Sequence, residues 1–98
     1  MTLHQPNYKR YWISYDISSD SRRTQLSQLL TGWGVRVQFS AFECVLNTRE
    51  IKQLQRQIKR LVKAQDGEVV ILQCAAPGRP GHPQLGRPHD AQHNYWLG

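Results

Sequence analysis

The sequence has few acidic residues, few cysteines and no long apolar run. Seven Asp and Glu residues stand against 13 Lys and Arg residues, which gives a formal net charge of +6 over 98 residues. This length suits one small domain. The excess of cations predicts an anionic partner, and nucleic acid is the first candidate, although a ribosomal or membrane surface would fit the charge equally well.

Other absences exclude whole classes of protein. No apolar run approaches the roughly 20 residues of a membrane-spanning helix, and residues 1–10 lack the apolar core of a signal peptide. We therefore expect a cytoplasmic protein with no membrane partner. Cys44 and Cys74 lack metal-ligand spacing, so two reduced and mostly buried thiols are expected. The sequence also lacks a glycine-rich phosphate loop and a Ser/His/Asp set.

Apolar periodicity predicts six elements between residues 10 and 74. Their order is strand, helix, strand, strand, helix, strand, which is the ferredoxin-like pattern: an α+β fold whose antiparallel sheet carries two helices on one face. The predicted elements are a strand over 10–17, a helix from Ser19 or Asp20 to about Trp33, a strand over 35–42, a short strand over 43–47, a helix from Asn47 or Thr48 to about Asp66-Gly67, and a strand over 68–74.

Two of these strands carry further expectations. In the strand over 35–42, Val35, Val37, Phe39 and Ala41 are expected on one face, and Arg36, Gln38 and Ser40 on the other. The strand over 68–74 is apolar on both faces around Val69–Leu72. Because the helices cover only one face of the sheet, we expect a second copy to cover the other, which predicts a homodimer.

The composition changes sharply near residue 77, where glycine and proline become frequent and periodicity stops. This change predicts a ferredoxin-like domain over 1–76 and a C-terminal arm over 77–98. Tyr95-Trp-Leu97 is an apolar anchor that would dock on its own domain or on a neighbour. His89 and His93 have i, i+4 spacing within the arm, but solvated side chains are expected there rather than metal ligands.

Asp16 is the main candidate for a catalytic and metal-binding residue. It lies at the end of the first predicted strand and is followed by a polar turn and then by Arg22 and Arg23. A carboxylate at a strand end, beside cations able to contact phosphate, suits metal-assisted phosphodiester chemistry. No second carboxylate shares the strand, so either two copies of Asp16 form the site or there is no site.

The clustered cations are candidates for nucleic-acid binding. Arg22 and Arg23 fall in the first turn of the first helix, where the helix dipole disfavours cations, and this favours phosphate contact over a solvated pair. The second helix has a face of one charge sign that suits a nucleic-acid backbone, although a solvated face explains it about equally well. The cations of this face are Lys52, Arg56, Lys59, Arg60 and Lys63, and Arg36 is a further candidate.

Two blocks of this sequence resemble a known family. Tyr15-Asp-Ile-Ser18, followed by Arg22-Arg23, and Gly34-Val-Arg-Val-Gln-Phe-Ser-Ala-Phe-Glu43 are similar to the small CRISPR-associated endonuclease family, over roughly residues 10–74. The resemblance implies a ferredoxin-like homodimer with its sheets face to face and a divalent metal, usually Mg²⁺, between the two copies of Asp16. It also implies partnership with the larger CRISPR integrase subunit in capturing foreign DNA.

The resemblance further implies that a strand after the fourth often joins the partner's sheet, here from Leu85 or Tyr95-Trp-Leu97. Three functions remain open at this point. The first is a metal-dependent endonuclease on RNA or DNA, in which Arg22, Arg23 and Ser40 position the nucleic-acid backbone for Asp16. The second is a non-catalytic scaffold that bridges DNA for the integrase. The third is a toxin-type ribonuclease on the same fold.

Overall fold

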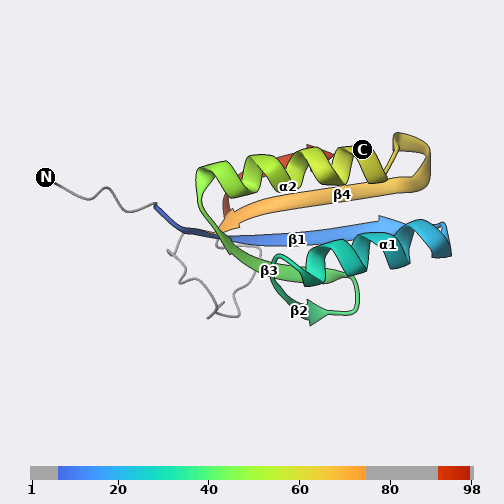
Figure 1. Cartoon of the computed structure of the whole chain (residues 1–98), viewed down its shortest axis with the longest axis horizontal. Coiled ribbons are helices and arrows are strands. Elements are labelled where there is room, and N and C mark those ends of the chain that lie inside the picture. The colour runs from blue at the N-terminus through green and yellow to red at the C-terminus, as the bar shows by residue number, and fades with distance from the viewer. Residues whose placement is uncertain (1–6, 75–90, 98) are drawn as a thin grey trace, which may run out of the picture.

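The computed structural model describes residues 7–74 and 91–97, which form a five-stranded antiparallel sheet with two helices on one face (Figure 1). The strands lie in the order β2-β3-β1-β4-β5, so the predicted ferredoxin-like α+β fold is confirmed. The elements are β1 (Lys9–Ile17), α1 (Asp20–Thr31), β2 (Val35–Gln38), β3 (Ala41–Leu46), α2 (Thr48–Leu61), a 3-10 turn (Ala64–Asp66), β4 (Gly67–Cys74) and β5 (Ala91–Leu97).

The helix-side face of the sheet forms the main core. Tyr11, Ile13, Tyr15 and Ile17 of β1 are all buried there, as the alternation predicted. Apolar side chains of both helices pack against them at helical spacing. These helix residues are Leu26, Leu30, Ile51, Leu54 and Ile58.

Both helices begin at residues whose side chains cap the first turn. Ser19 is the N-cap of α1, and its hydroxyl accepts a hydrogen bond from the backbone nitrogen of Arg22 at 3.3 Å. Asn47 caps α2 in a reciprocal arrangement with Glu50, in which the two side chains accept backbone hydrogen bonds at 2.8 and 2.9 Å. These caps satisfy backbone donors that the first helical turn leaves unpaired, so each helix starts at a defined residue.

The predicted position of the β2–β3 reversal was wrong. The chain reverses at Phe39 and Ser40 rather than after Phe42, and a register shift lies between Arg36 and Gln38. Phe39 is therefore 82% exposed in the turn instead of sharing one strand face with Val35, Val37 and Ala41. The shift also places Arg36 beside Phe42 and Gln38 beside Ala41, so Arg36, Gln38 and Ser40 do not share one face as predicted.

The second helix ends earlier than predicted. α2 stops at Leu61 because Val62 has an extended backbone, with φ −108° and ψ 129°, and its side chain is buried. Lys63 therefore lies beyond the helix and starts the 3-10 turn. Four of the five cations predicted for this face therefore remain on the helix as exposed side chains. We call them the α2 stripe: Lys52, Arg56, Lys59 and Arg60.

The sheet face opposite the helices, which we call the second face, carries a smaller apolar cluster. Trp12, Ala41 and Cys74 are buried in this cluster, and Val37 and Leu72 pack against them. The predicted buried thiols are confirmed for both cysteines. Burial raises the pKa of the Cys44 thiol to about 12, and the neighbouring charge of Glu43 adds to the shift.

The predicted C-terminal arm falls largely outside the described residues, as does Leu85. Its described part, β5, pairs antiparallel with β4 of the same chain and includes Tyr95-Trp-Leu97. Within residues 7–74 and 91–97, no helix has the length and apolar character needed to cross a membrane.

Gly67 joins the 3-10 turn to β4 in a backbone conformation that only glycine adopts readily, with φ +144° and ψ −155°. A Cβ at this position would lie 2.0 Å from the carbonyl oxygen of Asp16. Because both the conformation and the contact exclude a side chain, we expect Gly67→Ala to lower the free energy of unfolding by at least about 2 kcal/mol. Urea unfolding followed by circular dichroism measures this change.

Gly32→Ala is the matched control. Gly32 has an ordinary φ of −76°, and a Cβ there would meet the carbonyl oxygen of Leu29 at 3.4 Å, an ordinary contact. We expect this variant to remain within about 1 kcal/mol of the parent protein. Equal destabilisation by the two substitutions would show that close packing at Gly67 does not position the end of β1.

Candidate active site

Asp16 has a carboxylate neighbour on the adjacent strand. In the register of β1 and β4, Asp16 lies directly opposite Glu68, so both side chains project from the second face of the sheet. Both residues are exposed. Opposite residues of antiparallel strands have Cβ atoms about 4.5–5.5 Å apart, so one ion can contact both carboxylates. Among the described residues, neither carboxylate forms a salt bridge.

Sequence reasoning missed Glu68 because the two residues lie more than 50 positions apart. The signal was present in the fourth predicted strand, where Val69 and Ile71 face the helices. Alternation then directs Glu68 to the same face as Asp16, and antiparallel pairing brings the start of β4 to the end of β1. Figure 1 shows that β1 ends, α1 begins and β4 begins at the same end of the molecule.

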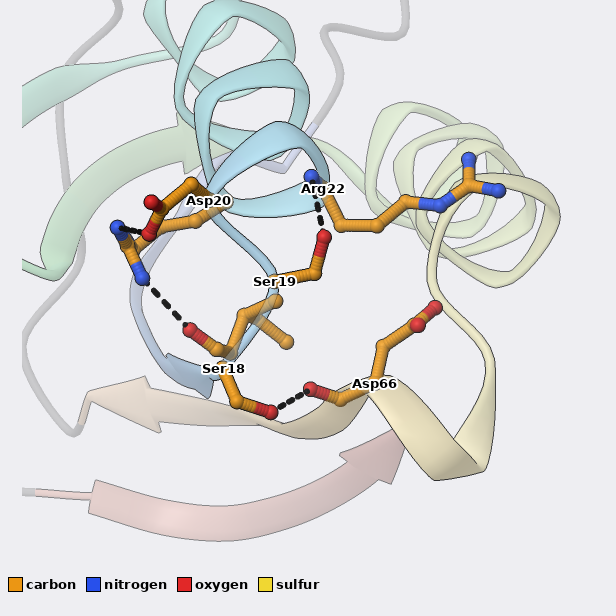
Figure 2. Close-up of polar contacts among 7 residues, drawn as sticks. Ser18, Ser19, Asp20, Arg22 and Asp66 are labelled. Atoms are coloured by element: carbon orange, nitrogen blue, oxygen red, sulfur yellow. Dashed lines mark hydrogen bonds and ion pairs between the residues drawn. The ribbon is translucent and has the colours of Figure 1, made fainter.

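A short network holds this end of the sheet together (Figure 2). The backbone carbonyl of Asp66 accepts hydrogen bonds from the backbone nitrogen of Ser18 at 3.1 Å and from its hydroxyl at 3.3 Å. The Asp66 carboxylate in turn accepts a hydrogen bond from the backbone nitrogen of Lys63 at 2.9 Å. The turn before Glu68 is therefore tied to the turn after Asp16, which fixes the backbone from which the two carboxylates project.

The two arginines at the start of α1 have different environments. Arg23 donates a hydrogen bond to the carbonyl oxygen of Ile17 at 3.0 Å and forms an ion pair with Asp20. Arg22 is exposed, and Figure 2 shows its side chain extending away from Asp20. Within the described residues, no ion pair joins either arginine to Asp16. Arg23 therefore stabilises the end of β1, whereas the guanidinium of Arg22 is exposed to solvent.

Ser40 and Arg36 are placed differently from Asp16. The carbonyl oxygen of Ser40 accepts a hydrogen bond from the backbone nitrogen of Tyr15 at 3.0 Å, so Ser40 contacts the end of β1 through its backbone. Arg36 lies on the helix side, with its guanidinium carbon 4.9 Å from the centre of the Phe42 ring. Arg36 also contacts Ser27 of α1, so its side chain lies next to that helix and not on the second face.

The α2 stripe lies on the solvent side of the helix layer. Lys52, Arg56, Lys59 and Arg60 are exposed, while Ile51 and Leu54 of the same helix point into the core. The sheet therefore separates the stripe from Asp16 and Glu68. The sequence predicted two groups of cations, and the structure shows that only the group at the start of α1 lies at the carboxylate end of the sheet.

The carboxylate pair fits a hard divalent cation. Mg²⁺ takes oxygen ligands and is usually held by one or two carboxylates while it retains several waters. Asp16 and Glu68 supply this number of ligands on adjacent strands. No group of three or more His, Cys, Asp or Glu side chains suitable for a metal occurs in the described part of the chain. A single chain therefore offers two protein ligands here and leaves room for water and substrate oxygens.

The fold and the site together define a small ferredoxin-like α+β protein with a carboxylate pair and cations at one end of its sheet. The family model described as "CRISPR associated protein Cas2" matches residues 9–77, and the chain belongs to this family. The resemblance found in the sequence is thereby confirmed.

Curated relatives are similar to this chain over different lengths. "CRISPR-associated endoribonuclease Cas2 1" of Chloroflexus aurantiacus is 47% identical over 58 residues, which cover 59% of this chain and 62% of the relative. "CRISPR-associated endoribonuclease Cas2" of Thermus thermophilus is 35% identical over 80% of this chain and 88% of the relative. The chain therefore spans about three-fifths of the Chloroflexus relative and most of the Thermus one.

A solved structure supports the fold. The crystal structure of a hypothetical protein from Thermus thermophilus superimposes with a TM-score of 0.64 and 34% sequence identity. The match covers 81% of this chain and 84% of the other. The two proteins therefore share the fold over most of their lengths.

Proposed function

We propose that this chain is a metal-dependent phosphodiesterase that cleaves RNA or DNA and takes part in CRISPR spacer acquisition. The observation that carries the proposal is the exposed Asp16–Glu68 pair, at the end of the sheet where Arg22 and Arg23 begin α1. The names of the relatives, which include both endoribonucleases and an endonuclease, support the reaction class. Comparing cleavage by the purified protein with Mg²⁺ and with a chelator tests the proposal, and we expect activity only with Mg²⁺.

Each residue has a role that follows from its position. Asp16 and Glu68 would hold Mg²⁺, which when bound supplies a more acidic water and stabilises charge on the phosphate. Arg22, exposed at the start of α1, contacts the phosphate backbone and orients it toward the second face. Arg23 supports this arrangement because it ties the helix to the carbonyl of Ile17, next to Asp16.

We also propose a homodimer in which two copies of the second face approach each other. Two carboxylates and water make a loose site, and a second chain would double the protein ligands. Trp12, Ala41 and Cys74 are already buried within one chain, so they do not require a partner. Support comes instead from the exposed carboxylates and from Val70 and Leu72, which remain only half-buried on this face.

The α2 stripe favours a second role in the same complex. Its four cations lie on the layer opposite the carboxylates, so nucleic acid bound there is not at the cleavage site. A one-signed surface of this kind binds the phosphate backbone without reading bases. We propose that the stripe holds DNA while the protein assists the CRISPR integrase subunit, which is the scaffold function.

Glu68→Gln tests the contribution of the second carboxylate. Like charges directly opposite each other destabilise an antiparallel pair, so removing one should raise the free energy of unfolding without metal by about a few tenths of a kcal/mol. The same substitution removes a metal ligand, so we expect the Mg²⁺ concentration for half-maximal cleavage to rise about tenfold. Urea unfolding and a Mg²⁺ titration of cleavage measure the two effects.

Asp20→Asn is the control for Glu68→Gln. Asp20 is also an exposed carboxylate at this end of the molecule, but it is on α1 and pairs with Arg23. Its substitution should leave the Mg²⁺ requirement unchanged. If Glu68→Gln also leaves the Mg²⁺ requirement unchanged, Glu68 is not a metal ligand.

A further inference from the structure

A small pocket lies on the helix side of the sheet, between α1 and the β2–β3 turn. It has a volume of about 180 Å³, and its lining includes Arg23, Thr24, Ser27, Gln28, Arg36 and Phe39. Sites for drug-sized ligands are usually about 300–1,000 Å³, so this pocket suits one chemical group of a larger molecule. Its described lining has two guanidinium groups and no carboxylate.

Arg36 is held in the wall of this pocket by three contacts. Its guanidinium lies over the Phe42 ring at 4.9 Å and donates hydrogen bonds to the hydroxyl of Ser27 and the carbonyl oxygen of Phe39. These contacts join β2, α1 and the turn. A cation positioned in this way is preorganised to meet an anion, because its side chain is already ordered before binding.

Phe39 is the second unusual feature of the pocket. It is 82% exposed at the tip of the β2–β3 turn, although the apolar side chains on either side of it in the sequence pack into clusters. An exposed aromatic ring beside guanidinium groups is the combination on which unpaired bases stack while their phosphates meet cations. A protein partner would instead be expected to bury a wider apolar patch.

We propose that this pocket is a subsite for one unpaired nucleotide, with the base stacked on Phe39 and the phosphate contacted by Arg36. The inference deepens the proposed function and rests on it for the class of ligand. Tyr15 lines the pocket on the helix side, whereas Asp16 projects from the other face. The subsite therefore binds a nucleotide other than the one cleaved, and it favours single strands or unpaired ends over blunt duplexes.

Phe39→Ala in the full chain tests the subsite. Binding is measured by fluorescence anisotropy with labelled single-stranded RNA, single-stranded DNA and a blunt DNA duplex of one sequence. Losing one base–aromatic stack should weaken single-strand binding about tenfold. The dependence on salt should not change, because no cation is removed, and duplex binding should stay within about twofold of the parent. The two single-stranded arms show whether RNA or DNA is preferred.

Val35→Ala is the matched control, and Phe39→Trp is the conservative variant. Val35 is the other large apolar side chain that the described residues expose, at 51%, and it does not line the pocket. Val35→Ala should bind as the parent does, and Phe39→Trp should bind single strands at least as tightly. Both results would indicate that the aromatic ring at position 39 stacks on the base.

Several results would overturn the subsite. These are unchanged single-strand binding by Phe39→Ala, an equal loss on duplex, no single-strand binding by the parent protein, and a change in oligomeric state, which would assign Phe39 to a protein contact. The proposed nuclease function fails differently, through absence of Mg²⁺-dependent cleavage by the parent protein. Binding and cleavage are measured separately, so the two failures are distinguishable.

Discussion

Asp16→Asn is expected to reduce Mg²⁺-dependent cleavage of RNA and DNA by at least about 100-fold. The substitution keeps the size of the side chain and removes the negative charge that would hold the metal. A bound metal contributes several kcal/mol to stabilising charge in the transition state, and each 1.36 kcal/mol corresponds to a factor of ten in rate. Single-turnover cleavage of labelled oligonucleotides, with parent and variant at saturating Mg²⁺, measures the effect.

The fold of Asp16→Asn should be unaffected. Asp16 is exposed and pairs with Glu68 only through the strand register, so the variant should unfold at the same or slightly higher urea concentration. Asp66→Asn is the control, because its backbone carbonyl still binds Ser18 and its side chain lies outside the carboxylate pair. Equal cleavage by the parent protein and Asp16→Asn would show that the catalytic site lies elsewhere.

Removing the α2 stripe is expected to produce the second large effect. The combined substitution of Lys52, Arg56, Lys59 and Arg60 with Gln should weaken duplex DNA binding for every sequence tested. The slope of log K against log salt is negative, and each lost phosphate contact makes it shallower by about 1. The magnitude of the slope should therefore decrease by up to about 4. Anisotropy titrations at five salt concentrations measure it.

The contribution of the α2 stripe to DNA binding should be separable from the cleavage reaction. Because the sheet lies between α2 and Asp16, cleavage of a short oligonucleotide at saturating concentration should be retained by the quadruple variant. Gln53→Ala, an exposed and uncharged position on the same helix, serves as the control for helix perturbation. If the quadruple variant has the same salt slope as the parent protein, the α2 stripe does not bind DNA and is only a solvated face.

Much of the fold was predictable because periodicity and capping residues point to the same elements. The inward residues of β1, the Ser19 and Asn47 caps and the antiparallel sheet all agree with the sequence. The position of the β2–β3 reversal was not predictable in this way. Alternation continues without a break from Val35 to Ala41, and the two turn residues, Phe39 and Ser40, include no glycine, proline, asparagine or aspartate.

The candidate site was only partly predictable. Asp16 could be identified because it lies at a strand end beside cations. Glu68 required the pairing register of β1 and β4, which local patterns do not contain. The pocket at Phe39 and Arg36 depended on the mislocated turn, so it was hidden from the sequence for the same physical reason.

The central proposal is that Asp16 and Glu68 form a metal site that two copies of this chain share. It is tested most directly by the distance between the two Asp16 carboxylates in a crystal structure of the protein grown with Mn²⁺ in place of Mg²⁺. We expect a dimer with its second faces opposed, a separation of about 4–8 Å between the two Asp16 carboxylates, and an anomalous peak between them. A dimer that places the two Asp16 residues on distant surfaces, with no metal at either, would contradict it.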